Sequence, residues 1–410
     1  LIDDIVLILL LFFFYMVILG KSPEELQYHL DLLYTYCSNW GLEVNAEKTK
    51  IMVFRKRGAL RRGESWTYNN QEIEVVNEFN YLGTIFKYTG NFSSNTEYIV
   101  GKALKALNVL LVNCKKLPLK PKILCQLFDA FVGSILLYAS EIWGFSKSKE
   151  IERVHLKFCK RVLNVRLNTC TAGVYGELGR YPLYISRYVR IVKYWCKVLN
   201  SDNIIIKKLY EQGLRDCENG YINWVGSVKK LLNEYGFSFV FTDNSNVDLS
   251  NFQNIFKQRV TDCFIQEWYG KVDNSVVLEE YKYFKNGFEY EGYLDMLSSD
   301  LRFYVSRFRL SAHSLRIQSG RFARNAIPRN ERYCLCCQTT NIEDNFHFIL
   351  TCPCYRELRE TYINNYYYYR PSMFKLTELF KSSNMPILSN LSKYIKLALK
   401  KRSNILNNVM

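Results

Sequence analysis

Four residues near the C-terminus have the types and spacing of a metal site: Cys334, Cys337, His347 and Cys352, arranged as C-x2-C-x9-H-x4-C. Three thiolates and one imidazole suit a tetrahedral Zn²⁺, with Zn–S distances of about 2.3 Å and a Zn–N distance of about 2.0 Å. Because protein would supply all four ligands, no position would remain for a reactive water, and the metal would be structural. The alternative is a group of ordinary buried thiols.

Two further cysteines, Cys336 and Cys354, lie beside the proposed ligands, so the ligand set could shift by one or two residues. We expect Cys336 to be a spectator thiol, and Cys354 is the residue that would replace Cys352 if the ligand set shifts. The flanking segments carry a collar of arginines, at Arg316, Arg321, Arg324, Arg329, Arg332, Arg356 and Arg359. A closed zinc knuckle inside a basic collar indicates a grip on nucleic acid.

The whole chain carries an excess of positive charge. Its 410 residues include 55 Lys and Arg against 39 Asp and Glu, for a formal net charge of +16. Phosphate backbones attract such a chain without sequence preference, and the 15% aromatic content adds stacking groups for single strands. The 13 cysteines are scattered, and no secretory cleavage pattern is present. We therefore expect an intracellular protein, nuclear and cytoplasmic, without a disulfide framework.

A second candidate for chemistry lies at the N-terminus, where Asp3 and Asp4 precede an apolar run from Ile5 to Leu19. Carboxylates are natural ligands of Mg²⁺, although a turn before a strand has the same pattern. The run is shorter than the roughly 20 residues of a spanning helix, and no cationic region precedes it as in a signal peptide. We predict a buried strand with extra apolar residues and keep a membrane anchor as a weaker hypothesis.

The residues that follow predict an amphipathic helix and then a strand. Ser22 is an N-cap type, Pro23 suits the first helical position, and Gly41 ends the helix. The apolar face would consist of Leu26, Leu30, Leu33 and Cys37. Residues 42–54 form a turn that leads into a strand, and a hairpin-like section ends at residues 79–84.

Helices are predicted beyond this point. Apolar periodicity covers residues 97–114, 123–138 and 148–163, and a basic turn with two prolines, which includes Lys115 and Lys116, separates the first two. The third helix carries Arg153, Lys157, Lys160 and Arg161. A solvated basic face on an ordinary helical bundle is the alternative to a nucleic-acid surface.

The succession of these segments resembles a known family, the reverse transcriptases of non-LTR (LINE-type) retrotransposons. The resemblance covers the C-terminal half of the polymerase palm and continues to the terminal knuckle. It rests on Asp3-Asp4, the amphipathic helix, Trp40-Gly-Leu-x-Val-Asn-x-x-Lys-Thr-Lys50, Phe79-x-Tyr-Leu-Gly83, Tyr138-Ala-Ser-Glu-Ile-Trp-Gly144, Glu177-Leu-Gly-Arg-Tyr-Pro-Leu183, Phe308-Arg-Leu-Ser-x-His-x-Leu-Arg316 and Gly320-Arg321.

The resemblance implies roles for particular residues. Asp3 and Asp4 match the carboxylates that bind catalytic Mg²⁺, and Lys48 matches a lysine near the incoming triphosphate, as a charge stabiliser or proton donor. Tyr81, Leu82 and Gly83 match the primer grip. Lys115 and Lys116 match the thumb by position, and Arg321 matches the segment before the knuckle. A solvated surface lysine and a plain turn glycine are the alternatives for Lys48 and Gly83.

Departures from the family limit these expectations. Leu1 replaces the usual aromatic residue, Ile2 takes a position that is often small, and the apolar run is longer by about one β-segment. The fingers and the first half of the palm, with the third metal-binding aspartate and the dNTP pocket, have no counterpart in the sequence. We interpret the chain, which begins at Leu1, as a fragment or an incomplete gene model. We expect no polymerisation by this chain alone, so whether it is an enzyme stays open; Mg²⁺ and dNTP would act only in the complete enzyme.

The sequence therefore predicts an α+β chain with a partial polymerase palm sheet, a mainly helical thumb and connector, and a small zinc knuckle. The predicted divisions are palm 1–95, thumb 96–200, connector 201–325, knuckle 326–365 and a basic helical tail 366–410. The expected function is target-primed reverse transcription of element RNA, with RNA and DNA as partners and no membrane association. The alternative is a non-enzymatic nucleic-acid-binding remnant of a decayed element.

Overall fold

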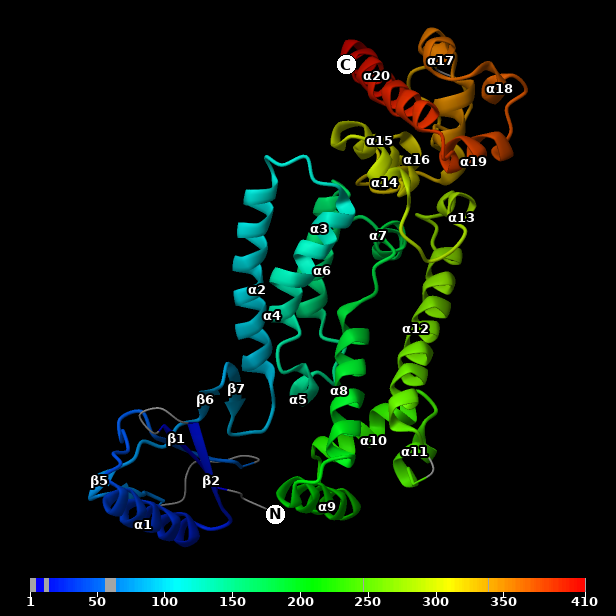
Figure 1. Cartoon of the computed structure of the whole chain (residues 1–410). Coiled ribbons are helices and arrows are strands. Elements are labelled where there is room, and N and C mark those ends of the chain that lie inside the picture. The colour runs from blue at the N-terminus through cyan, green and yellow to red at the C-terminus, as the bar shows by residue number, and fades with distance from the viewer. Residues whose placement is uncertain (1–4, 11–14, 56–63, 246, 338, 410) are drawn as a thin grey trace. The chain divides into compact units, whose positions relative to one another are not determined.

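The computed structural model describes residues 5–10, 15–55, 64–245, 247–337 and 339–409 of the chain. Over these ranges the chain is mostly helical with short strands, in agreement with the predicted α+β class. It forms two compact units, Leu1–Lys102 and Ala103–Met410, which we describe separately (Figure 1). The predicted inner divisions at residues 200, 325 and 365 stay predictions.

The first unit contains the strands of the described chain. These are β1 (Ile5–Leu10), β2 (Tyr15–Gly20), β3 (Lys50–Val53), β4 (Thr67–Tyr68), β5 (Gln71–Glu72), β6 (Glu78–Tyr81) and β7 (Thr84–Lys87). The main sheet has the order β2-β1-β3, and both pairings are antiparallel, with Ile5 opposite Gly20 on one side and opposite Val53 on the other. The other strands form the two hairpins β4-β5 and β6-β7.

The apolar run at the N-terminus differs from the prediction of one strand with extra residues. Its described parts, β1 and β2, pair with each other from Ile5–Gly20 to Leu10–Tyr15. The run is too long for one ordinary strand, and pairing it with itself satisfies its backbone hydrogen-bonding groups. Among the described residues, none of the helices combines the length and apolar character that crossing a bilayer requires.

Helix α1 (Pro23–Trp40) begins and ends where its capping residues predict. The Ser22 Oγ accepts a hydrogen bond from the Glu25 amide at 3.2 Å, which satisfies a free donor of the first turn. Gly41 follows the last turn in the left-handed conformation, with φ of 61°. Glycine takes this conformation without the steric cost that a side chain adds.

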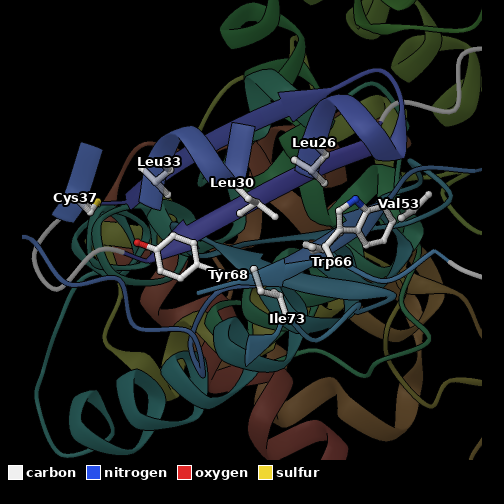
Figure 2. Packing of buried hydrophobic residues seen from close by; sticks show 9 residues of the cluster. Leu26, Leu30, Leu33, Cys37, Val53, Trp66, Tyr68 and Ile73 are labelled. Atoms are coloured by element: carbon white, nitrogen blue, oxygen red, sulfur yellow. The ribbon is translucent and has the colours of Figure 1, made fainter. Parts of the chain in front are cut away.

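The predicted apolar face of α1 forms one side of the core of the first unit. Figure 2 shows this face packed against residues from β3, β4 and the segment around β5. Trp66 is 1% exposed, and its Nε1 donates to the Pro23 carbonyl at 2.9 Å. The buried members of the core are Leu26, Leu30, Leu33, Cys37, Ile51, Val53, Trp66, Tyr68 and Ile73.

Helix α2 (Ser93–Cys114) crosses the division between the units, and the second unit then continues as helices. These are α3 (Pro121–Phe128), α4 (Ser134–Leu136), α5 (Ser140–Trp143), α6 (Lys149–Val162), α7 (Thr171–Leu178), α8 (Leu183–Leu199), α9 (Ile204–Glu218), α10 (Trp224–Glu234), α11 (Ser238–Thr242), α12 (Leu249–Asp273), α13 (Tyr281–Phe284), α14 (Tyr293–Met296), α15 (Ser299–Arg309), α16 (Arg316–Ser319), α17 (Arg356–Tyr362), α18 (Asn365–Tyr368), α19 (Met373–Lys381) and α20 (Met385–Val409). Short 3₁₀ and π turns are η1 (Asp129–Gly133), η2 (Arg329–Glu331), η3 (His347–Thr351) and η4 (Pro353–Tyr355).

The helix predicted over residues 123–138 is interrupted. The π turn η1 separates α3 from α4, which ends at Leu136, so the predicted single helix is wrong in this detail. The π turn contains Asp129, whose carboxylate pairs with the Arg180 guanidinium, with Oδ1 and Nη2 at 2.5 Å. The change from α-helix to π turn therefore coincides with an ion pair to Arg180, which the local apolar pattern does not reveal.

Two helices organise the packing of the second unit. Helix α8 contacts α5, α10 and α12, and the long α12 lies beside α8 in Figure 1. Near the C-terminus, α20 contacts α15, α17 and α19. Helix α20 also contacts the segment that carries the predicted metal ligands, because the Tyr394 hydroxyl donates to the Phe348 carbonyl at 2.6 Å.

Candidate metal centre

The structure brings the four predicted ligands together. The Sγ atoms of Cys334, Cys337 and Cys352 and a ring nitrogen of His347 all lie within 4.8 Å of one another. The Cys337 Sγ and the His347 Nε2 are 3.4 Å apart. Tetrahedral zinc bonds of about 2.0–2.3 Å place ligand atoms about 3.5–3.8 Å from one another, so the donor set fits Zn²⁺ with little adjustment.

A π turn explains why a His-x4-Cys spacing works here. The Cys352 amide donates to the His347 carbonyl at 2.8 Å, which closes the π turn η3. In an α-helix of 3.6 residues per turn, residues five apart point in different directions. The wider π turn returns residue i+5 to the side of residue i, so both side chains face the cluster.

Neighbouring groups orient the ligands. The His347 Nδ1 lies 3.0 Å from the Thr351 Oγ1, which leaves Nε2 to face Cys337. The Arg359 guanidinium donates to the Cys352 carbonyl at 2.7 Å and thereby holds the ligand backbone. Such outer contacts fix the tautomer and direction of a ligand, and they usually accompany a real metal site.

A second group of donors, Cys334, Cys336 and Glu343, also lies close together, but its carboxylate is already engaged. Both Glu343 oxygens accept from Arg402 of α20 at 2.7 Å, and Oε2 also accepts from the Arg316 amide at 2.6 Å. The fully buried Glu343 therefore ties α20 to the cluster and is a poor metal ligand.

The two neighbouring cysteines, Cys336 and Cys354, lie outside the four-ligand set. The Cys336 Sγ accepts from the Tyr355 hydroxyl at 3.3 Å and lies outside the four-ligand set. Cys352, and not its proposed substitute Cys354, completes that set. Hydrogen bonds from the Cys336 and Cys352 thiols lower the pKa of Cys334, so the thiolate of this ligand is favoured.

The arginine collar is only partly a surface. Arg332 is 8% exposed and donates to the carbonyls of Ile317 and Ile327, each at 2.9 Å. Arg359 is 5% exposed and donates to backbone carbonyls around the cluster. The interpretation of these two arginines as phosphate contacts is therefore wrong, because both guanidiniums hold the backbone of the module.

Other collar arginines remain near the surface. Arg329 pairs with Glu279, and Arg321 is half-buried and donates to the Val276 carbonyl at 3.1 Å. Arg324 and Arg356 are exposed. Arg356 lines a groove of about 400 Å³ together with Lys401 of α20, beside Cys354. Glu357 also lines the groove and pairs with the Lys401 Nζ at 3.5 Å, so the lining carries two cations and one carboxylate next to the metal cluster.

The predicted catalytic residues are only partly described. Asp3 and Asp4 lie outside the described residues. Lys48 is exposed in a turn that Asn45 shapes: the Asn45 Oδ1 accepts from the Lys48 amide at 3.0 Å. The turn precedes β3, whose first residue, Lys50, lies opposite Ile8 of β1. The role of Lys48 beside a catalytic pair stays a prediction.

The predicted primer grip is a tight hairpin. Leu82 and Gly83 form the two-residue turn between β6 and β7, with φ of 48° and 83°. Two positive φ values define a type I′ turn, which is tolerated by glycine and strained for leucine. Leu82 is 51% exposed at the tip. The positive φ at this position is a sufficient conformational reason for a glycine there, and the role of Gly83 in a primer grip stays a prediction.

The predicted thumb lysines divide into two groups. Lys115 and Lys116 are exposed after the end of α2. By contrast, Lys160 of α6 is 8% exposed, and its Nζ donates to the Leu167 carbonyl at 2.5 Å. The prediction of Lys160 as part of a basic surface is therefore wrong, because it stabilises the loop after its own helix.

Sequence reasoning missed a buried ion pair between two of the quoted motifs. Arg309 and Glu177 are both fully buried, and the Arg309 Nε and Nη2 both approach the Glu177 Oε1, at 3.1 and 3.0 Å. The Tyr293 hydroxyl also donates to Glu177, at 2.5 Å. Glu291 adds a second carboxylate 3.0 Å from the Arg309 Nη2. The two motifs contain Glu177 and Arg309, but a single sequence carries no signal that these residues are in contact.

A titrating carboxyl lies near the cluster and leads to a prediction about pH. Burial, reinforced by the charge of Asp344, raises the pKa of Glu280 from the ordinary 4.5 to about 8. The folded chain therefore keeps a proton on Glu280 that the unfolded chain releases above pH 4.5. Stability should fall as pH rises from about 4.5 to about 8, by on the order of 1 kcal/mol per pH unit from this group.

We expect the Glu280→Gln variant to lose this part of the pH dependence and to gain stability over the native chain at pH 8. Urea unfolding at pH 6, 7 and 8 with saturating zinc measures the effect, and a Glu267→Gln variant on the exposed face of α12 is the control. Parallel pH profiles for native and Glu280→Gln chains would refute the assignment.

Comparison with known proteins identifies a distant relative. An uncharacterized transposon-derived protein of Caenorhabditis elegans is 27% identical to this chain over 177 residues, which cover 43% of this chain and 62% of that protein. The chain therefore spans less than two thirds of its relative. No known family model matches the chain. The similarity points to an origin in a mobile element.

Proposed function

We propose that this chain grips RNA or single-stranded DNA through a zinc knuckle built on Cys334, Cys337, His347 and Cys352. The observation that carries the proposal is the closed donor set beside a groove of net positive charge, where Arg356 and Lys401 face one carboxylate, Glu357. A site with four protein ligands has no open position for catalysis, so its use is structural. Zinc modules with adjacent cations and aromatic groups bind nucleic acid in this way.

We further propose that the chain performs this task as the C-terminal part of a LINE-type reverse transcriptase. The order of the motifs and the transposon-derived relative support this proposal. The complete enzyme would copy element RNA into DNA, and this chain would contribute the primer grip and the knuckle. The alternative is a nucleic-acid-binding remnant of a decayed element. The gene upstream of the codon for Leu1 separates the two: an open frame encoding another aspartate motif and fingers supports the polymerase, and a stop codon supports the remnant.

The grip is tested on the full chain by zinc content and by binding of RNA and single-stranded DNA across a salt series. We expect about one zinc per chain, as the four-ligand site implies. An Arg356→Gln Lys401→Gln variant should keep its zinc and weaken binding, with the slope of log K against log salt reduced by about 1.4, because each lost single-strand phosphate contact contributes about 0.7.

The matched control removes two exposed cations away from the groove, Lys208→Gln with Lys230→Gln. A separate Lys115→Gln Lys116→Gln variant tests the predicted thumb, because a loss of slope there would indicate phosphate contacts. Stoichiometric zinc with unchanged binding in the Arg356 and Lys401 variant would make the knuckle a structural element only. A chain without zinc would overturn the proposal.

A further inference from the structure

We propose that a groove between α5, α8 and α12 is a second binding site, for a short stretch of single-stranded nucleic acid. In this site a base stacks on Tyr194 and phosphates contact Arg190, Lys193 and Lys197. The site shares no residue with the metal cluster. It deepens the proposed function by naming where a single strand lies, and it does not depend on zinc.

The groove has the size of a ligand site. Its volume is about 760 Å³, and it is lined by Glu141 of α5, by successive turns of α8 and by Gln253 of α12. Sites for small organic ligands occupy roughly 300–1,000 Å³. The groove therefore has room for a nucleotide with its flanking phosphates, and it is open, so a strand can enter and leave.

The cations form a row along one side of the groove. Arg190, Lys193 and Lys197 are exposed at helical spacing on α8. At 1.5 Å per residue, the row is about 10 Å long, which suits a chain of phosphates better than a single anion. Within the part of the chain that the structure describes, none of the three forms an ion pair. Glu141 is the acidic residue of the lining, so the groove is net positive.

One cation is held in place before any ligand arrives. The Arg190 Nη1 donates to the Leu137 carbonyl at 3.0 Å. A guanidinium has five donors in a planar fork, so this bond leaves others for a phosphate. Anchoring reduces the rotamer entropy that binding would otherwise cost.

Tyr194 supplies a stacking surface. It is 37% exposed, and its ring meets the Trp224 ring edge to face, with centroids 5.6 Å apart. Trp224 is itself fixed, because its Nε1 donates to the Glu141 carbonyl at 2.9 Å. A held aromatic ring beside a row of cations is the combination that binds single strands without sequence preference. Asn200 and Gln253 offer polar groups to the base edge.

The test uses the full chain and fluorescein-labelled twelve-nucleotide oligo(U) and oligo(dT). Replacing Arg190, Lys193 and Lys197 by Gln should reduce the salt slope by about 2, at about 0.7 for each lost contact. Tyr194→Ala should weaken binding on the order of 10-fold with the slope unchanged, and Tyr194→Phe should restore it, because the ring and not the hydroxyl stacks. Tighter binding of oligo(U) would assign the site to RNA, and tighter binding of oligo(dT) would assign it to DNA.

The matched control removes the same charge from exposed positions outside the groove, by Lys208→Gln, Lys230→Gln and Lys257→Gln. Equal loss of binding in the control and groove variants would overturn the proposal, because general charge would then explain both. Displacement of the oligonucleotide by polyglutamate at equal charge would also overturn it in favour of an acidic peptide. If the Arg356 and Lys401 variant binds normally while the groove variant does not, the knuckle grip fails and this site stands.

Discussion

A Cys337→Ser His347→Ala variant is expected to unfold the C-terminal part of the second unit, because it removes two of the four predicted metal ligands. Structural zinc contributes about 10–16 kcal/mol to the folding of small zinc modules at pH 7, because the site exists only when the chain is folded. Here the ligands come from two segments, and the metal would join the π turn that carries His347 and Cys352 to the segment that carries Cys334 and Cys337.

The loss should spread beyond the ligands. Glu343 lies between the cluster and α20, where Arg402 binds both of its oxygens. Without the metal, the loop that positions Glu343 relaxes and α20 loses its buried partner. We expect hydrogen exchange to become fast in α17 and α20 while α8 and α12 keep their protection, since the latter pack in another part of the unit.

Calorimetry and hydrogen exchange with and without a zinc chelator measure this effect. Cys354→Ser is the matched control, because it removes a neighbouring thiol that lies outside the four-ligand set. Chelation that leaves both the unfolding temperature and the protection of α20 unchanged would contradict a structural metal.

An Arg309→Met variant is expected to cost about 3–5 kcal/mol, the typical loss when one partner of a buried ion pair is removed. The change would leave Glu177 buried without its bidentate partner and would bring it near the carboxylate of Glu291. It would also leave the Phe380 carbonyl without the Arg309 Nη1, now at 3.1 Å. The pair therefore joins α7, α15 and the end of α19.

A double-mutant cycle separates pairing from simple loss of packing. The variant Glu177→Gln Arg309→Met should be less unstable than the sum of its two single variants, because the second change removes the unpaired charge. Urea unfolding measures the four chains. Lys271→Met is the control, since its pair with Glu267 is exposed and should contribute less than about 1 kcal/mol. Additive losses would show that Glu177 and Arg309 are not coupled.

Local sequence determined those features whose partners lie within a few residues. Ser22 and Gly41 mark the two ends of α1, because capping joins residues that are three to five positions apart. The apolar face of α1 follows from the helical period. The Cys and His residues gather because their whole motif spans one short segment. Gly83 and the turn before β3 are local in the same sense.

Tertiary structure alone decided which charges are available to a partner. Lys160, Arg332 and Arg359 look like surface cations in the sequence, yet backbone carbonyls bind them in the interior. No local pattern distinguishes Arg190 and Lys197 from other helix cations, and they line a groove only because α5 and α12 pack beside α8.

Tertiary structure alone also decided which charged residues form buried ion pairs. Glu177 and Arg309 meet across 132 positions of sequence, and Glu343 and Arg402 across 59. A charge is stable in the interior only when a partner arrives to replace water, and folding brings that partner from a part of the chain that no local pattern identifies.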